Sequence, residues 1–259
     1  MASDNKAMVV IGAGAGIGGH AAARFAAGGY HAALCRRSDE AGLQRLVGQI
    51  RDEGGSASGY LLNAAEDGAI EDVLAEVERD VGPVEVVLYN LGAQIGDRSL
   101  FDTTHKTFEL GWRLATFGLF RVAKALAPGM VDRGSGTILV TSATAAMRGN
   151  AGQHSHAAAM GGRRLLCQTL NAELAPKGVH VAHVVVDGAV NSPDTLGKMV
   201  GGKWQEFLDA KGEDGIIDPA DLAEVYWTLA HQPKNCWTHE MDVRPHSDRP
   251  WFNGAGLTL

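Results

Sequence analysis

The chain has 259 residues, 45% hydrophobic and 20% charged, which is the composition of a globular protein with a sizeable core. A formal net charge of −7 offers no overall positive charge for a phosphate backbone or an anionic bilayer, so we expect no nucleic acid and no membrane as partners. The cysteines Cys35, Cys167 and Cys236 form no CxxC pair and no basic-then-apolar leader begins the chain, so we expect no disulfide framework and a cytoplasmic location.

Short β-branched runs alternate with helical stretches along the whole chain. This alternation predicts one α/β domain, residues 1–259, with a doubly wound parallel sheet and helices on both faces. The predicted strands are AMVVIG, HAALC, GYLLN, VEVVLY, GTILVTS, VHVAHVVV and THEMDVR. The predicted helices span residues 16–27, 39–53, 67–80, 104–132, 151–176 and 219–231.

The first predicted strand runs into IGAGAGIGGH, where Gly12, Gly16 and Gly18 form a GxxxGxG turn. Residues without side chains let the backbone turn tightly and approach a pyrophosphate, whose charge then meets the positive end of the helix that begins near Ile17. The alternative is loop composition alone, since the chain has 34 glycines. We interpret the turn, between its strand and its helix, as a dinucleotide phosphate site.

The stretch 191–217, NSPDTLGKMVGGKWQEFLDAKGEDGII, breaks the alternation. We expect it to be a mobile helical flap over the carboxyl ends of the strands, where a substrate lid would lie. The apolar residues that indicate a hydrophobic or aromatic substrate are Met199, Trp204 and Phe207 of this stretch, with Leu91 and Met147.

Several segments together resemble the short-chain dehydrogenase/reductase family over essentially the whole chain. They are the GxxxGxG turn, YNLG at 89–92, the strand GTILVTSATA, the long helix opening near 151, and DGAVNSP. The resemblance implies a Rossmann-type fold, a nicotinamide cofactor, and a homodimer or homotetramer built on the two longest helices. It places Asn90 and Gly92 at the floor of the nucleotide site beside the ribose, and assigns Gly188 and Val190 of DGAVNSP to cofactor binding.

The end of the second strand indicates which nicotinamide cofactor is bound, because an acidic residue there holds ribose hydroxyls and a basic one favours a 2′-phosphate. The chain has Cys35-Arg36-Arg37 at this point. A guanidinium binds phosphate through two parallel hydrogen bonds, so we expect NADP(H). The alternative is that both arginines only solvate the strand end. Asn63 stands where the family commonly has an aspartate by the adenine, and we expect it at the cofactor.

The family's catalytic Asn, Ser, Tyr and Lys are all replaced in this chain. The Asn and Ser positions fall on Ala115 and Ala143, and the Tyr and Lys positions hold His156 and Met160. Ser142 is adjacent to Ala143 and is the candidate catalytic hydroxyl. Neighbouring strand residues face opposite ways, however, so Ser142 requires a bulge or a shifted alignment to reach the site.

His156 is the candidate general acid or base, because imidazole titrates near neutral pH, and the nearby helix start favours its neutral form. Met160 has no charge and is at most a weak acceptor. Tyrosine needs a nearby positive charge to titrate near neutrality, whereas imidazole does not. The exchange of Tyr for His therefore removes one main reason for the lysine, which explains why both residues differ together. His154 is a candidate substrate contact. The alternative for HSH is a solvated helix start with accidental histidines.

Metal binding is not predicted, because His154 and His156 are too few ligands and the sequence has no HExxH motif. His180, His183 and His231 are interpreted as surface residues of strands or helices. Arg164, one turn beyond the Lys position, is interpreted as structural.

Three hypotheses for the function follow. The first is a divergent NADP-dependent oxidoreductase that acts on a carbonyl-, imine- or alkene-type small molecule, with His156 or water handling the proton. The second is a nucleotide-binding protein without redox activity, serving as a sensor or a partner subunit. The third is a lyase or isomerase with His156 as base. Fold alone does not decide among them, and the family resemblance favours the first.

Overall fold

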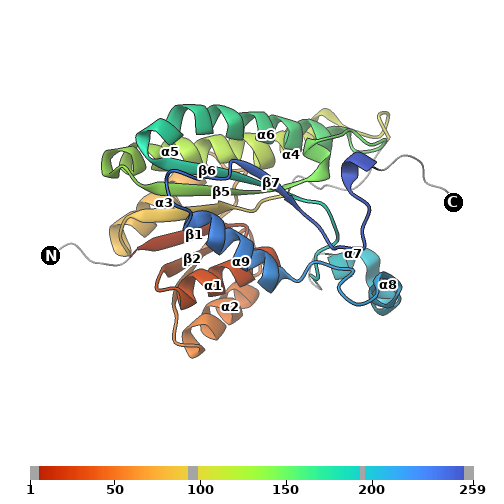
Figure 1. The fold of residues 1–259 in the computed structure, drawn as a ribbon, viewed down its shortest axis with the longest axis horizontal. Helices are drawn as coiled ribbons and strands as arrows, with labels where there is room; N and C mark the ends of the chain where they lie inside the picture. The colour runs from red at the N-terminus through yellow and green to blue at the C-terminus, as the bar shows by residue number, and fades with distance from the viewer. Residues whose placement is uncertain (1–5, 93–98, 193–195, 254–259) are drawn as a thin grey trace.

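The computed structural model describes residues 6–92, 99–192 and 196–253, shown as a coloured ribbon in Figure 1. A seven-stranded parallel sheet in the order β3-β2-β1-β4-β5-β6-β7 forms the centre, which confirms the predicted parallel α/β fold in a single domain. The strands are β1 (Ala7–Ile11), β2 (His31–Arg36), β3 (Ser56–Leu61), β4 (Val84–Tyr89), β5 (Gly136–Ala143), β6 (Val179–Val186) and β7 (Glu240–Val243).

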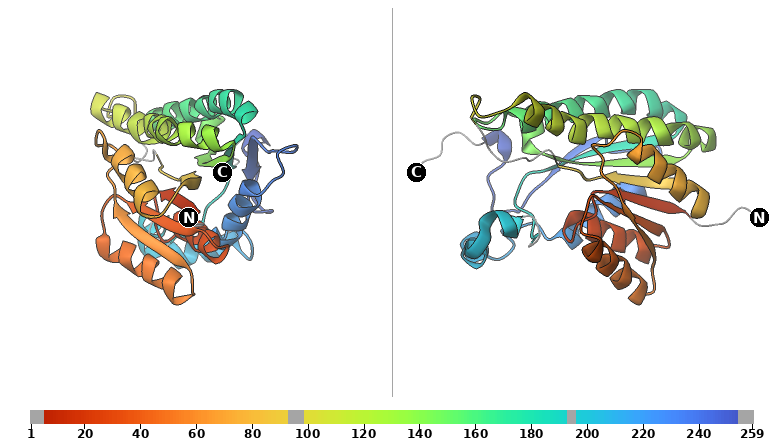
Figure 2. Two further views of the ribbon diagram at one scale, coloured as in Figure 1. Left: turned by 90° about the vertical axis from the view of Figure 1, so that its left-hand side faces the viewer. Right: turned by 180° about the vertical axis from the view of Figure 1, so that it is seen from behind.

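Helices cover both faces of the sheet (Figures 1 and 2). The helices α3, α4, α5 and α6 lie on one face, and α1, α2 and α9 lie on the other. The α-helices are α1 (Ile17–Ala27), α2 (Glu40–Asp52), α3 (Ala69–Asp80), α4 (His105–Trp112), α5 (Gly118–Arg133), α6 (His154–Leu174), α7 (Lys198–Val200), α8 (Trp204–Lys211) and α9 (Pro219–Ala230). Short 3-10 turns occupy Thr144–Ala146, Ala175–Lys177, Gly201–Lys203 and Trp251–Asn253.

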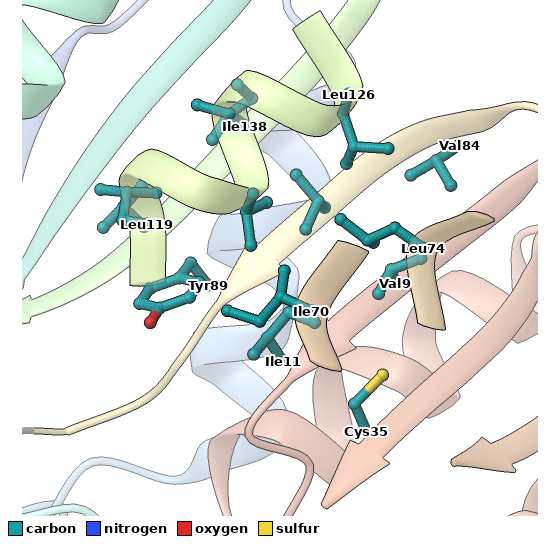
Figure 3. Packing of buried hydrophobic residues seen from close by; sticks show 14 of the residues in the cluster. Val9, Ile11, Cys35, Ile70, Leu74, Val84, Tyr89, Leu119, Leu126 and Ile138 are labelled. Atoms are coloured by element: carbon teal, nitrogen blue, oxygen red, sulfur yellow. The ribbon is translucent and has the colours of Figure 1, made fainter. Parts of the chain in front are cut away.

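The core consists of two layers, one on each face of the sheet. All five residues of β1 are buried, as expected for a strand covered on both sides. Val9 and Ile11 pack toward α3 and α5, and Met8 and Val10 pack toward α1 and α9. Figure 3 shows the first layer, where Ile70 and Leu74 of α3 and Leu119 and Leu126 of α5 meet the strands. The period of two along the strand therefore determines both layers.

The strand order reverses between β1 and β4, because the chain places β2 and β3 on one side of β1 and returns to the other side with β4. In open α/β sheets the crevice at such a reversal, beyond the carboxyl ends of the strands, is the usual ligand site. The structure adjusts several predicted boundaries. The third strand begins at Ser56 rather than at residue 59, and the last strand is limited to Glu240–Val243.

The predicted helix 104–132 is one helical run, His105–Arg133, interrupted by a π-helical turn at Arg113–Phe117. By length and composition this run is able to cross a membrane. It nevertheless packs along the sheet between α3 and α6, with Leu119 and Leu126 fully in the core. Its apolar character is therefore consistent with a core helix of the fold.

The predicted flap 191–217 contains α7 and α8, which project from the body at the carboxyl edge of the sheet (Figure 1). Its two ends are held together by a parallel bridge between Val190 and Ile217. The amide of Asn191 donates to the Ile217 carbonyl at 2.9 Å. Residues 193–195 of the predicted flap lie outside the described residues. The base of the segment is thus hydrogen-bonded to the core.

Two of the histidines that the sequence places on the surface are buried, which corrects that interpretation. His180 is 2% exposed and His183 is not exposed at all. Both contact the chain at the start of β7: the His183 ring lies 3.1 Å from the Glu240 carboxylate, and the His180 ring bonds to the carbonyl of Thr238, just before the strand, at 2.8 Å. Glu240 also accepts two hydrogen bonds from Arg164, so Arg164 contributes to this structural network.

Candidate active site

A cavity of about 650 Å³ lies at the carboxyl edge of the sheet, at the reversal of strand order between β1 and β4. It brings together the glycine turn, the end of β4, the end of β5, the start of α6 and the chain after β6. The lining residues are Gly12, Gly14, Gly16, Ile17, Gly18, Asn90, Leu91, Gly92, Thr141, Ala143, Thr144, Ala145, Asn150, Gln153, His156, Val186, Gly188, Val190, Ser192 and Leu196.

The glycine turn forms one wall of this cavity, and its residues are glycines for steric reasons. Gly12 has φ +100°, which favours glycine, and a Cβ on Gly18 would lie 2.5 Å from the Gly12 carbonyl oxygen. A Cβ on Gly14 would meet no atom within 4 Å, so this residue borders open space. The α1 helix begins at Ile17, next to that space. A pyrophosphate fits this cradle at the positive end of the helix.

Asn90 connects the end of β4 to the glycine turn. Its side-chain amide donates to the Gly12 carbonyl at 3.0 Å, and its backbone amide donates to the Ile11 carbonyl at 2.9 Å. Leu91 and Gly92 follow it along the cavity wall, and Gly188 and Val190 line the cavity from beyond β6. The cofactor residues assigned from YNLG and DGAVNSP therefore share one cavity with the glycine turn.

The predicted cofactor arginines lie at the end of β2, outside the cavity lining. Arg36 forms an ion pair with Asp39 at 2.8 Å, and Arg37 is exposed. Asp39 caps α2 by accepting the Gly42 amide at 3.0 Å, and this hydrogen bond, followed by the charge of Arg36, lowers the pKa of the Asp39 carboxyl. Arg45 and Lys198 lower it further through their charge. This strand end thus carries more positive than negative charge around Asp39.

Asn63 follows β3, and its side-chain amide is hydrogen-bonded to nearby residues. Its amide donates to the Glu66 carboxylate at 2.8 Å, and its carbonyl oxygen accepts from the Ala65 amide at 3.3 Å. Asn63 does not line the cavity. Its assignment to the adenine stays a prediction.

His156 lies in the first turn of α6 and lines the cavity. Its neighbour Ser155 is buried and donates toward the Thr107 and Phe108 carbonyls of α4, at 3.3 and 3.1 Å. Successive helix residues are about 100° apart, so a helix held by Ser155 on the α4 side directs His156 and His154 to different sides. His154 is half-buried and does not line the cavity. Among the described lining residues, His156 carries the titratable side chain.

The other three residues that the sequence pattern assigns to the catalytic positions of the family are apolar. Ala143 lines the cavity, while Ala115 and Met160 pack together with Ala145 and Ala159 beneath it. Met160 is 2% exposed, so it fills the space under the wall and offers nothing to a ligand.

Ser142 is 3% exposed and stands on the strand face opposite to the lining residues Thr141 and Ala143. Its hydroxyl oxygen has no hydrogen-bond partner among the described residues. The structure therefore does not bring Ser142 to the cavity, and its catalytic role stays a prediction.

The predicted substrate contacts Met147 and Trp204 also lie outside the lining. Trp204 stacks on Phe207 in α8, with ring centroids 5.9 Å apart. Met199 lies in α7, and its side chain is outside the part of the structure that is described. The flap segment reaches the cavity through Ser192 and Leu196 instead.

The sequence reasoning missed several polar residues of the lining. Ser192 lies in the quoted DGAVNSP motif, and its hydroxyl stands 2.7 Å from where a Cβ on Gly16 would lie. Thr144 is adjacent to the aligned Ala143, so a search of that turn for hydroxyls would have found it. Asn150 and Gln153 precede α6 in a loop without periodicity, where the sequence offers no signal.

Within residues 6–92, 99–192 and 196–253, no three histidine, cysteine or acidic side chains are placed to hold a metal ion.

Comparison with known proteins identifies the family. A sequence model of the family described as short chain dehydrogenase matches residues 6–197. The short-chain reductase protein NovJ of Streptomyces niveus is 33% identical over 217 residues, which are 83% of this chain and 81% of that protein.

Solved structures agree with this family. A short-chain dehydrogenase from Rhodopseudomonas palustris is 32% identical, with a TM-score of 0.78 over 93% of this chain and 99% of that chain. A variant of actinorhodin polyketide ketoreductase with NADPH is 25% identical, with a TM-score of 0.82 over 95% of this chain and 98% of that chain. The glycine turn and the cavity that it borders are thus set in a chain that belongs to the short-chain dehydrogenase family of oxidoreductases.

Proposed function

We propose that the protein is an NADP-dependent oxidoreductase in which His156 exchanges a proton with the reacting group of the substrate. The observation that carries the proposal is one cavity lined by both the glycine turn and His156. When bound, a reduced nicotinamide supplies a hydride to an electrophilic carbon. The chain itself binds the nucleotide, excludes water and holds the proton.

The residues that would hold the nucleotide are those whose shape or hydrogen bonding supports it. Gly12 and Gly18 let the backbone approach the pyrophosphate, and Asn90 fixes the turn through the Gly12 carbonyl. Ser192 and Gly188 border the far side of the cavity. Because these contacts come mainly from backbone and glycine, they need no catalytic side chain to be retained.

NADP rather than NAD is proposed because of the charge at the end of β2. Arg36 is held there by Asp39, and Arg45 and Lys198 act on the same carboxylate. A 2′-phosphate carries about two negative charges. The positive charge of this region therefore favours its binding. An exposed ribose hydroxyl gains nothing comparable from guanidinium groups.

His156 would deliver the proton to the atom that gains electrons when hydride arrives on the neighbouring carbon, which is the oxygen of a carbonyl, the nitrogen of an imine or the α-carbon of an activated alkene. In the reverse direction the neutral imidazole would accept it. The apolar lining of the substrate half of the cavity, including Leu91, Ala145, Val186 and Leu196, suits a hydrophobic or aromatic compound. A carbonyl, an imine or an activated alkene is the proposed reacting group.

A second candidate is a nucleotide-binding protein without redox turnover, acting as a sensor or a partner subunit. It is favoured by the apolar replacements at Ala115, Ala143 and Met160, because these leave His156 as the one titratable side chain of the described lining. The two candidates share the nucleotide site and differ in turnover.

One experiment separates these candidates. NADPH and NADH are titrated against the protein by calorimetry, and carbonyl, imine and activated-alkene compounds are then screened for loss of reduced-nicotinamide absorbance. We expect tighter binding of NADPH and turnover on one of the three classes. Tight NADPH binding without turnover on any class supports the sensor, and binding of neither nucleotide refutes both candidates.

We also propose a homodimer or homotetramer joined through α4, α5 and α6. On these helices Trp112 stacks on Phe117 with ring centroids 5.3 Å apart, and Phe117 stacks on Phe120 at 6.3 Å. Trp112 and Phe120 are 44% and 43% exposed, and Leu165 of α6 is 62% exposed. Such aromatic surface is typical of subunit contacts. Light scattering at micromolar concentration should give a multiple of the 27.2 kDa chain mass, and a monomeric mass would contradict the proposal.

The proposed compartment is the cytoplasm. Cys35 and Cys167 are buried free thiols, and Cys236 is an exposed one. Free thiols fit a reducing compartment.

A further inference from the structure

We propose that Arg163 is the positioning residue of this cavity, joining two segments that line it to the π-helical turn beneath it. Arg163 lies in α6, two turns beyond His156, and is 1% exposed. The inference rests on the proposed function for its consequence in nucleotide binding, but its structural part stands independently of it.

Each nitrogen of the Arg163 guanidinium donates to a different backbone segment. Nε donates to the Ala115 carbonyl at 2.9 Å, Nη1 to the Thr141 carbonyl at 2.6 Å and Nη2 to the Leu91 carbonyl at 2.5 Å. The guanidinium carbon also lies 5.2 Å from the centre of the Tyr89 ring. One side chain therefore joins the end of β4, the end of β5 and the π-helical turn.

Two of these carbonyls, those of Leu91 and Thr141, lie where the pairing of β4 with β5 stops. The ladder between β4 and β5 ends at Tyr89 and Val140, one or two residues before Leu91 and Thr141. Ala115 lies in the π-helical turn, where the hydrogen bonds of the helix change to the i+5 spacing. A buried carbonyl without a donor is costly, so Arg163 fills the point where the two strands diverge.

The charge of Arg163 is balanced by these carbonyl dipoles. Within the described ranges no carboxylate lies at ion-pair distance from it, and arginine stays protonated in proteins. Leu91 and Thr141 both line the cavity. A positive charge is thus buried directly behind the cavity floor, where it favours negative charge on a reacting oxygen. Met160, one turn nearer the cavity, contributes no charge.

Arg163 would affect nucleotide binding through Asn90. Arg163 holds the carbonyl of Leu91, and the neighbouring Asn90 donates to Gly12 in the glycine turn. If Leu91 moves, Asn90 and the phosphate cradle move with it. Arg163 is separated from the cavity by Leu91 and Thr141, so it would not contact the nucleotide or the substrate itself. It would act by fixing the position of these lining residues.

The test compares Arg163→Lys with Arg164→Gln. Lysine keeps the charge but its single nitrogen cannot span three separated carbonyls. Arg164 is the neighbouring arginine of the same helix, and its two 2.7 Å bonds go to Glu240 at the far edge of the sheet. Arg163→Gln, which loses both the charge and the fork, serves as the second variant.

The first measurement is amide hydrogen exchange, which needs no ligand. We expect Arg163→Lys to speed exchange roughly tenfold in residues 89–92, 113–117 and 141–146, with the rest of the chain unchanged. Arg164→Gln should leave these three segments at wild-type rates. Unchanged exchange in Arg163→Lys, or an equal change in Arg164→Gln, would overturn the proposal, as would failure of Arg163→Lys to fold, which would assign Arg163 to the core in general.

The second measurement is NADPH affinity in the same variants by fluorescence titration. We expect about tenfold weaker binding in both Arg163 variants and wild-type affinity in Arg164→Gln. If the unaltered protein binds no NADPH, the proposed function fails while the exchange measurement still decides the role of Arg163. If the wild type binds and the Arg163 variants bind equally well, the coupling through Asn90 is refuted.

Discussion

The two walls of the cavity differ in what they are made of. The phosphate wall consists of glycine and backbone, because a side chain would be strained at Gly12 by its φ of +100° and would clash at Gly18, where a Cβ would lie 2.5 Å from the Gly12 carbonyl oxygen. The opposite wall depends on side chains, and there Ala143 and His156 line the cavity at the positions where the sequence pattern predicts the serine and the tyrosine of the family. One wall is thus built from backbone and the other from side chains. The fold constrains the first wall and leaves the second free to vary.

The largest effect should come from blocking the phosphate wall at Gly14. A Cβ there would meet no atom within 4 Å and Gly14 lines the cavity, so we expect Gly14→Leu to fold and to project into the cavity. We expect NADPH affinity to fall roughly 100-fold or more, which is about 2.7 kcal/mol. Calorimetry measures the affinity and a thermal melt checks the fold.

Gly48→Leu is the matched control for Gly14→Leu, because a Cβ on Gly48 also meets no atom within 4 Å and Gly48 lies in α2, away from the cavity lining. It should bind NADPH as the wild type does. Wild-type affinity in Gly14→Leu would mean that the nucleotide binds elsewhere.

The next effect tests the side-chain wall. His156→Ala should lower turnover on a confirmed substrate by roughly 10²-fold, as expected for loss of a general acid or base, with NADPH affinity nearly unchanged. Steady-state kinetics and nucleotide titration measure the two quantities. Full activity in His156→Ala would assign the proton to water or to the substrate itself.

Two further variants sharpen the result for His156. Met160→Ala removes a buried side chain from the small cluster below the wall, so it should cost roughly 2 to 5 kcal/mol of stability while turnover is kept. His154→Ala decides between the sequence-based expectation of a substrate contact and the position found, outside the cavity lining. Unchanged Michaelis constants in His154→Ala would favour the position found.

A smaller effect concerns which nucleotide the phosphate wall prefers. Arg36→Asp replaces the cation beside Asp39 by a second carboxylate, so it should weaken NADPH by about tenfold or more and make NADH the tighter ligand. Competitive titration of the two nucleotides gives the ratio. Arg37 is exposed beyond the strand end. The ratio of NADPH to NADH affinity in Arg37→Asp, compared with that in Arg36→Asp, shows how much each arginine contributes. Equal affinities in the unaltered protein would show that neither arginine meets a 2′-phosphate.

The alternation of β-branched runs with helical stretches was sufficient to predict the sheet and its helices, and the glycine turn was sufficient to predict the wall of the cavity that it forms. Parallel strands bring their carboxyl ends to one edge, so GxxxGxG, YNLG and DGAVNSP, far apart in the sequence, meet in one cavity. These signals are local and repeat a known pattern, and for that reason the sequence contained them.

What could not be predicted depends on partners distant in the sequence. The run VHVAHVVV indicated exposed histidines, but Thr238 and Glu240, both more than fifty residues away, cover and bond His180 and His183. Arg163 likewise gave no signal, because its three acceptors are backbone carbonyls of separate segments. A sequence pattern shows which residues share a face, but it does not show which carbonyls lack a donor.

The smallest expected effect is a pH dependence that is strongest in the half of the molecule that carries the side-chain wall. Burial lowers the pKa of His183 to about 4, against 6.5 for a free imidazole. The unfolded chain therefore binds the proton more tightly, so the contribution to stability is complete above pH 6.5 and is lost as the pH falls from 6.5 toward 4. At pH 5.5 the loss is about 1.4 kcal/mol.

Urea unfolding at pH 8 and pH 5.5 measures this loss, and His183→Gln should reduce it. The reduction is partial, because the pKa values of His31 and His180 are also lowered by burial. His246→Gln, at an exposed position, should keep the wild-type loss. Amide exchange at pH 5.5 should rise first in β6, β7 and α6, where His183, Glu240 and Arg164 meet, and last in β1 and the glycine turn. An equal rise of amide exchange in both halves would show that the two walls of the cavity are not independently stabilised. The two walls would then differ in their chemical groups but not in their stability.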